Sequence, residues 1–78
     1  MNLARQNQIA DALPHFAAAA KLEPTNPEIH FNYGLALRDG QQPAAATAQF
    51  QQALKLTPDF PAAKTALAAL LAAHPELK

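Results

Sequence analysis

Prolines recur in this chain at a fixed interval, and that period constrains the fold more than any other feature. Pro24 and Pro27 are followed at the same distance by Pro58 and Pro61, so a Pro-x-x-Pro element occurs twice. The same offset aligns further identical residues: Leu3 with Leu37 and Leu71, Gln8 with Gln42, Phe16 with Phe50, Lys21 with Lys55, and Leu22 with Leu56. A fixed period of about 34 residues predicts stacked repeats, none of which buries its apolar face alone.

The apolar residues favour helices over strands. Half of the sequence is apolar, and Ala and Leu supply most of that half, whereas Val and Trp are absent. Ala and Leu have the highest helix propensities, while β-branched and aromatic residues suit strands. We therefore expect an all-α fold of antiparallel helical hairpins, stacked as a solenoid of about two repeats with incomplete ends.

Capping residues divide the complete repeat into two helices. Asn26 is a predicted N-cap and Pro27 a first helical residue, which starts a helix running to about Arg38. Gly40 is expected to end that helix in the left-handed conformation. A second helix is predicted over 43–56, because Thr57-Pro58 stops it.

The flanking copies are incomplete. In the first copy we expect a helical stub over 1–6 and a separate helix over 11–22. Pro14 fits the first turn of a helix capped by Asp11, whereas an earlier start would kink the helix there. The third copy contributes one helix over 62–73. We predict a single domain at 1–78, with a partial repeat at 1–26, a complete repeat at 27–60 and a half repeat at 61–78.

Helical spacing also predicts the buried face of each helix. Small residues are expected where helices approach closely, with Phe16 and Phe50 as the bulky residues between them. The expected core consists of Phe16, Ala19, Tyr33, Leu37, Ala46, Phe50, Ala53, Leu54, Leu67 and Leu71.

The spacing resembles that of the tetratricopeptide repeat family, whose helix-turn-helix units of about 34 residues carry W-x2-L-G-x2-Y, then A-x3-F and a closing Pro. The complete copy has Tyr33-Gly34-x2-Leu37, followed by Ala46-x3-Phe50 and a closing proline. His30 stands where the family prefers Trp. The second-helix half of the pattern occurs twice, in the first and the complete copies.

Composition argues against several classes of function. The formal net charge is zero, with six basic residues spread along the chain, so we expect no nucleic-acid partner. The longest apolar run is too short to span a membrane. Cys and Ser are absent and the three His are widely spaced, so we expect no metal, no cofactor and no catalytic site. The compartment stays open, with the cytoplasm as the default expectation.

Binding of a protein or peptide is the function that the resemblance implies. In this family ligands occupy a concave face built by the first helix of each hairpin. The corresponding residues are Glu28, Phe31, Asn32, Leu35, Arg38 and Asp39. Phe31 is the expected anchor for a peptide, with contact to a neighbouring hairpin as the alternative.

Two other readings involve the ends of the chain. The segment 66–73 is apolar on all sides, which predicts a homo-oligomer formed through the terminal helices, with Leu70 in the exposed seam. The chain would then be a self-associating structural repeat. Alternatively it is a fragment of the repeat array of a larger enzyme, such as a glycosyltransferase.

Overall fold

The computed structural model describes residues 3–77, with side chains from residue 8 onward. In this part of the chain it contains α-helices, a short terminal 3-10 turn and no strand, which confirms the all-α prediction. The elements are α1 (Leu3–Leu22), α2 (Pro27–Asp39), α3 (Pro43–Leu56), α4 (Pro61–Ala73) and η1 (Pro75–Leu77).

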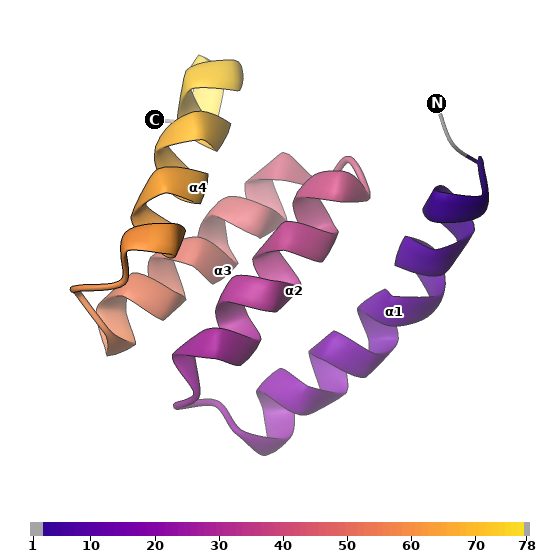
Figure 1. Ribbon diagram of the computed structural model, residues 1–78, viewed down its shortest axis with the longest axis horizontal. Coiled ribbons are helices and arrows are strands. Elements are labelled where there is room, and N and C mark those ends of the chain that lie inside the picture. Colours follow the sequence, from indigo (N-terminus) through magenta and orange to yellow (C-terminus); the bar gives the residue numbers. More distant parts are fainter. Residues whose placement is uncertain (1–2, 78) are drawn as a thin grey trace.

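The helices lie side by side in chain order, with α1 at one edge of the molecule and α4 at the other (Figure 1). The helices α2 and α3 form the central antiparallel hairpin. The helix α1 packs on α2, and α4 packs on α3 while also contacting α2. The resulting molecule is flat, measuring 34 × 31 × 18 Å along its principal axes.

Prolines define the starts of three helices, as the sequence predicts for two of them directly. Pro27, Pro43 and Pro61 each occupy the first turn, where a missing N–H group leaves no intrahelical hydrogen bond unmade. Asn26 is the N-cap of α2, and its side-chain oxygen accepts a hydrogen bond from the Glu28 backbone N–H at 3.1 Å.

The prediction of a left-handed Gly40 is wrong by one position. Gly40 has φ −83°, whereas Gln41 has φ 65°. The reason is that α2 extends to Asp39, so Gly40 is the cap and Gln41 takes the left-handed position. The Gln42 N–H donates to the Leu37 carbonyl at 2.8 Å and the Gln41 N–H to the Arg38 carbonyl at 3.1 Å, which together form a Schellman motif.

Residues 1 and 2 of the stub expected over 1–6 lie outside the described residues, and residues 3–6 are not separate from the helix expected over 11–22. Both belong to one 20-residue helix, α1, with Pro14 inside it. The turn that precedes α3 depends on Pro43, and the equivalent residue in the first copy is Ile9, which does not interrupt a helix. Pro14 and Ala10 are both exposed, so water can reach the Ala10 carbonyl that Pro14 leaves without an intrahelical donor.

The core lies between α2, α3 and α4. Four of the ten expected core residues are buried: Leu37, Ala46, Phe50 and Ala53. The other six, Phe16, Ala19, Tyr33, Leu54, Leu67 and Leu71, are only half-buried. Three further buried residues come from α4: Ala63, Ala66 and Leu70.

Leu70 corrects the expectation of an exposed seam at that residue. Its side chain is only 3% exposed and belongs to the same buried cluster as Phe50. The helix α4 is apolar on most sides, so its sequence carries little information about which side faces inward. The side that faces inward is set by contact with α2 and α3, which buries Ala63, Ala66 and Leu70.

The contact between Gly34 and Phe50 sets the distance between α2 and α3. Phe50 is 0% exposed, and a Cβ atom added at Gly34 would lie 2.7 and 2.8 Å from two of its ring carbons. Such distances are well below van der Waals contact, so only glycine permits this approach. A phenylalanine on one helix is thus matched to the absence of a side chain on the other.

His30 adds a polar connection to this hairpin. The ring is buried, with Nε2 2.8 Å from the Pro24 carbonyl oxygen and Nδ1 2.8 Å from Oε1 of the Gln49 amide. A carbonyl can only accept, so Nε2 donates the hydrogen bond to Pro24. Nδ1 then accepts from the Gln49 amide N–H, in the amide orientation that exchanges Oε1 and Nε2. His30 therefore joins the α1–α2 turn to α3.

Truncating the two equivalent phenylalanines should have unequal effects. We expect Phe50→Ala to lower the free energy of unfolding by about 3 to 5 kcal/mol, because it leaves a cavity in the closed core. Phe16→Ala should cost about half as much or less, since the Phe16 ring is only half-buried. Urea denaturation monitored by circular dichroism measures both values. Equal losses would show that the two rings are equally packed.

A methyl group at Gly34 should also destabilise the hairpin. We expect Gly34→Ala to cost about 1 to 3 kcal/mol despite the higher helix propensity of Ala, because the Phe50 ring has no free space into which it could move. Gly40→Ala is the matched control. Its added Cβ would have contacts of 3.2 and 3.3 Å, at an ordinary φ, and should cost less. A stabilised Gly34→Ala protein would contradict the close approach.

Removing the partner of His30 should be costly in the same way. Gln49→Leu leaves Nδ1 in a buried site without a hydrogen-bond partner, and the expected loss in the free energy of unfolding is about 1 to 3 kcal/mol. Gln51→Leu on the same helix changes an exposed residue and should stay within about 0.5 kcal/mol of the parent. Chemical denaturation of the two variants tests the difference.

Candidate functional site

An open groove of about 380 Å³ runs between α1 and α2. The two helices lie next to each other along one edge of the molecule (Figure 1). The helix α1 supplies one wall, formed by Gln8, Ile9, Ala12 and Phe16. The helix α2 supplies the other, formed by Asn32, Leu35, Ala36 and Asp39.

The lining of the groove combines apolar side chains with a few polar groups. The apolar members come from both helices, while Gln8 and Asn32 are exposed amides. Asp39 is the acidic member, and its carboxylate accepts hydrogen bonds from the Arg38 guanidinium at 3.3 Å. A groove of this kind suits an amphipathic segment, because apolar contacts supply affinity and the amides fix register.

Half of the residues predicted for a peptide site line this groove. They are Asn32, Leu35 and Asp39, which are spaced at i, i+3 and i+7 along α2. The other three, Glu28, Phe31 and Arg38, do not line it. Glu28 and Arg38 are exposed outside the groove, and Phe31 is half-buried.

Phe31 takes part in packing instead of projecting into solvent. Its ring centroid lies 5.9 Å from that of Phe50 and 5.2 Å from that of Phe60, with tilted planes in both pairs. Phe60 immediately precedes α4, so Phe31 connects the central hairpin to the next helix. The alternative expected from the sequence, contact with a neighbouring hairpin, is therefore what the structure has.

Sequence reasoning did not name the α1 wall of the groove. Phe16 was expected in the core, because the repeat offset aligns it with Phe50, just as it aligns Ala12 with Ala46. In the structure Ala46 and Phe50 are 0% exposed, whereas Ala12 and Phe16 are half-buried. The difference follows from the number of neighbouring helices. The helix α3 is covered by both α2 and α4, whereas α1 packs on α2. A count of neighbours for each helix would have identified the groove.

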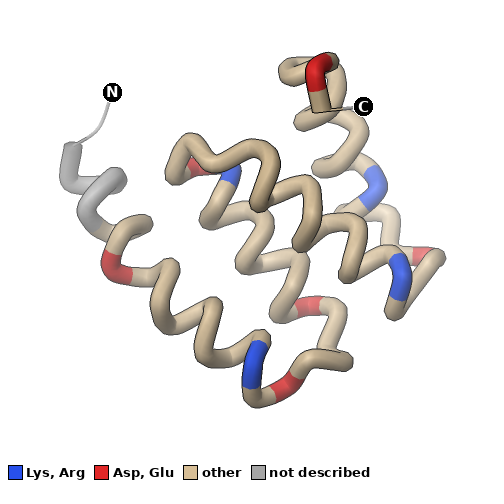
Figure 2. The backbone as a smooth tube through the Cα atoms, turned by 180° about the vertical axis from the view of Figure 1, so that it is seen from behind, with Lys and Arg blue, Asp and Glu red and all other residues tan. Residues whose placement is uncertain are grey.

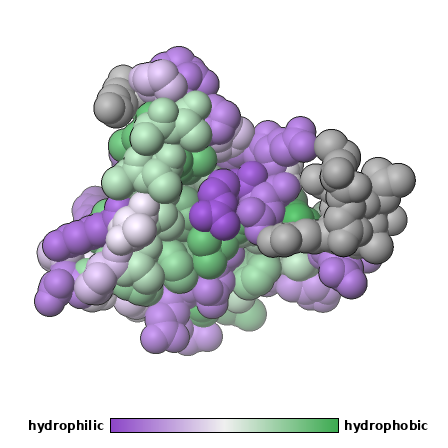
Figure 3. Space-filling model, turned by 45° about the horizontal axis from the view of Figure 1, so that its top comes forward, coloured by the Kyte–Doolittle hydropathy of each residue, from purple (hydrophilic) through white to green (hydrophobic). Residues whose placement is uncertain are grey.

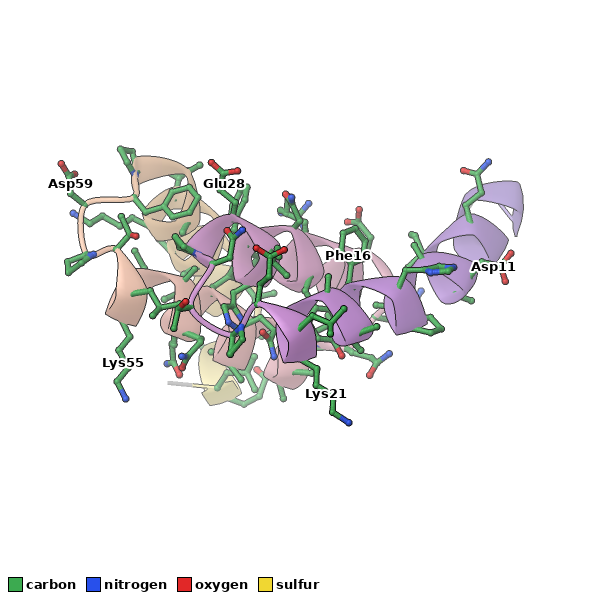
Figure 4. All side chains as sticks on the ribbon, turned by 90° about the horizontal axis from the view of Figure 1, so that it is seen from below. Asp11, Phe16, Lys21, Glu28, Lys55 and Asp59 are labelled. Carbon is green, nitrogen blue, oxygen red and sulfur yellow. The ribbon has the colours of Figure 1, made fainter. Side chains whose placement is uncertain are left out.

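Charged side chains are dispersed over the surface instead of gathering at one site. Figure 2 shows acidic and basic residues mostly near helix ends and turns, with long uncharged stretches between them. Glu28 and Asp59 project on one side of the molecule, while Lys21 and Lys55 project on the opposite side (Figure 4). Phe16 points to the same side as Glu28. The described residues therefore offer no concentrated basic surface of the kind that binds a phosphate backbone.

The described residues also lack the groupings that other classes of site need. Nowhere among the described side chains, at residues 8–77, do three or more His, Cys, Asp or Glu gather as metal ligands would. Of the helices in residues 3–77, none combines the length and hydropathy needed to cross a membrane. His74 pairs with Glu76 at 3.3 Å, close to the end of α4.

Comparison with known proteins agrees with this architecture. A family model described as tetratricopeptide repeat matches residues 1–59, which include α1, α2 and α3. No curated protein and no solved structure matches the chain. The match covers most of the sequence and the whole central hairpin, and the chain belongs to the tetratricopeptide repeat family.

Proposed function

We propose that the chain is an interaction module whose groove between α1 and α2 holds a helical segment of a partner protein. Tetratricopeptide repeats generally mediate protein–protein interactions and are generally noncatalytic. The groove between α1 and α2 is the proposed binding site, and a helix is the proposed ligand. Its walls come from two neighbouring repeats, α1 from the first and α2 from the second.

The observation that carries the proposal is that the residues equivalent to the groove walls in the next repeat are covered by a helix. One repeat after Ala12 and Phe16, the equivalent residues are Ala46 and Phe50 on α3. Both are 0% exposed, and the helix that covers them is α2, through contacts such as Gly34 with Phe50. The α1 wall of the groove therefore repeats a surface that already holds a helix.

The α2 wall gives the same result. One repeat after Asn32 and Ala36, the equivalent residues are Ala66 and Leu70 on α4. Ala66 and Leu70 are buried in the cluster that α2 and α3 complete, whereas Asn32 is exposed and Ala36 is half-buried. Two residues on each wall of the groove thus correspond to buried residues of the site where α2 lies, which supports a helix as the occupant.

Six residues were expected to bind a peptide, and the groove supports a revised set. Asn32, Leu35 and Asp39 remain in the proposed site on α2. Ala12 and Phe16 join them from α1. Glu28 and Arg38 lie outside the groove, and Phe31 contributes by holding α2 against the next helix.

A peptide with the sequence of α2 tests the proposal, because that helix occupies the equivalent site. We expect a synthetic peptide of residues 27–42 to shift the backbone amide resonances of the groove residues in the ¹⁵N-labelled chain. Ala12→Lys should remove these shifts by filling the groove. Ala10→Lys should retain them, since Ala10 and its repeat equivalent Ala44 are both exposed.

A second variant guards against an effect on folding. Asn32 is exposed and lines the groove from α2, so Asn32→Lys should weaken binding of the peptide without changing helicity. Circular dichroism of each variant checks the fold. Shifts that persist in both Ala12→Lys and Asn32→Lys would place peptide binding outside this groove.

A further inference from the structure

We propose that the occupant of the groove is α4 of a second copy of this chain, so that copies associate head to tail. This inference rests on the proposed function, in which the groove accepts a helix. It adds the identity of the helix and the resulting assembly. The argument depends on which faces of α1 and α4 are covered in one copy.

The helix α4 is the repeat equivalent of α2 and presents the same face without a partner. On α2 that face contains Gly34 and Leu37, which are buried between α2 and α3. The equivalents on α4 are Ala68, which is exposed, and Leu71, which is half-buried. The helix α4 therefore has an open surface where α2 has its partner helix.

The space-filling view agrees with this open surface. Figure 3 shows apolar residues gathered over α4, below the polar groups at its end. Ala68, the equivalent of Gly34, is the exposed alanine on this surface, and the other exposed alanines of α4 are Ala62, Ala69, Ala72 and Ala73. Small residues allow another helix to approach closely, as Gly34 does for α3.

The two open surfaces are the two halves of one contact that the molecule already contains. The helices α2 and α3 bury Gly34 and Leu37 against Ala46 and Phe50. The equivalents of Gly34 and Leu37 lie one repeat later on α4, and the equivalents of Ala46 and Phe50 lie one repeat earlier on α1. These helices lie at opposite edges of the molecule (Figure 1), so one copy cannot pair them within itself. Two copies can, with α4 of one placed on α1 of the next.

The contact between copies should be weaker than the internal hairpin. Ala68 has the Cβ atom that Gly34 lacks, so the helices must lie slightly farther apart or the Phe16 ring must move. Phe16 has room to move, because it is half-exposed and stacks on Tyr33 with a centroid distance of 6.5 Å. Thr65 replaces Phe31 and supplies less apolar area. We therefore expect reversible association.

The geometry is that of a heterologous contact. The surface on α4 differs from the surface on α1, so each dimer keeps one open surface of each kind. Such contacts extend into open chains unless the rotation between copies closes a ring. The expected signature is a mean mass that keeps rising with concentration instead of stopping at a dimer.

Sedimentation of the full 78-residue chain tests the inference. Over about 10 µM to 1 mM, the average mass should rise above the 8.3 kDa of one chain and keep rising. Ala68→Lys should hold the mass at one chain. Ala72→Lys is the matched control, because Ala72 is exposed like its equivalent Arg38 in the complete repeat, and this variant should behave as the parent does.

Mixing two blocked variants tests the head-to-tail arrangement. Ala68→Lys blocks the α4 surface and Ala12→Lys blocks the α1 surface, so each alone should be monomeric. Their equimolar mixture should form a 1:1 dimer and nothing larger, because each supplies the surface that the other lacks. A mixture that stays monomeric, while the parent associates, would overturn the pairing of α4 with α1.

The outcome separates this inference from the proposed function. A parent chain that stays at one-chain mass over the whole range would overturn self-association. If that chain still binds the peptide of residues 27–42 in a manner sensitive to Ala12→Lys, the groove keeps its function and takes a helix from another protein. Loss of peptide binding as well would reject both proposals.

Discussion

The packing of Phe50 against Gly34 is the contact on which the rest of the structure depends. Because the ring fills the space where a Cβ atom would lie, α2 and α3 approach closely and bury Phe50 completely. That approach also brings His30 within 2.8 Å of Gln49 and lets Phe31 contact both Phe50 and Phe60. The central hairpin is therefore held by one size match and by a few interactions that this match makes possible.

The same physics explains why the two edges of the molecule differ from its centre. A helix in a stacked repeat is covered on two sides only when it has neighbours on both. The helix α3 has α2 and α4, and its Ala46, Phe50 and Ala53 are 0% exposed. Equivalent residues of α1 are half-buried, and two of them line a groove. Binding capacity in this fold thus arises where a repeated surface lacks the helix that covers it elsewhere.

Much of the fold followed from local chemistry that a sequence makes visible. Asn26 and the prolines at 27, 43 and 61 act within one helical turn, so their consequences could be predicted without knowledge of the fold. The two local errors also have local causes. The helix α2 continues one position farther than expected, which moves the left-handed conformation to Gln41. Ile9 replaces the proline that starts α3, so α1 continues without a turn.

The site required information from helices that are distant in the sequence. The α2 wall was partly predicted, because Asn32, Leu35 and Asp39 share one face of a single helix. The α1 wall was missed, and the choice between Phe31 as a peptide anchor and Phe31 in contact with a neighbouring hairpin stayed open, because both depend on which neighbours a helix has. Leu70 shows the same limit, since a helix that is apolar on most sides leaves its inward face to be chosen by its neighbours.

By itself, the sequence determined the helical period, the starts of α2, α3 and α4, and the contrast in size between residues such as Gly34 and Phe50, because capping and periodicity act over a few residues and the repeat offset reproduces them. Only the tertiary structure decided which equivalent residues are closed and which are open. Burial depends on the number of neighbouring helices, and the residues of a single repeat carry no record of that number.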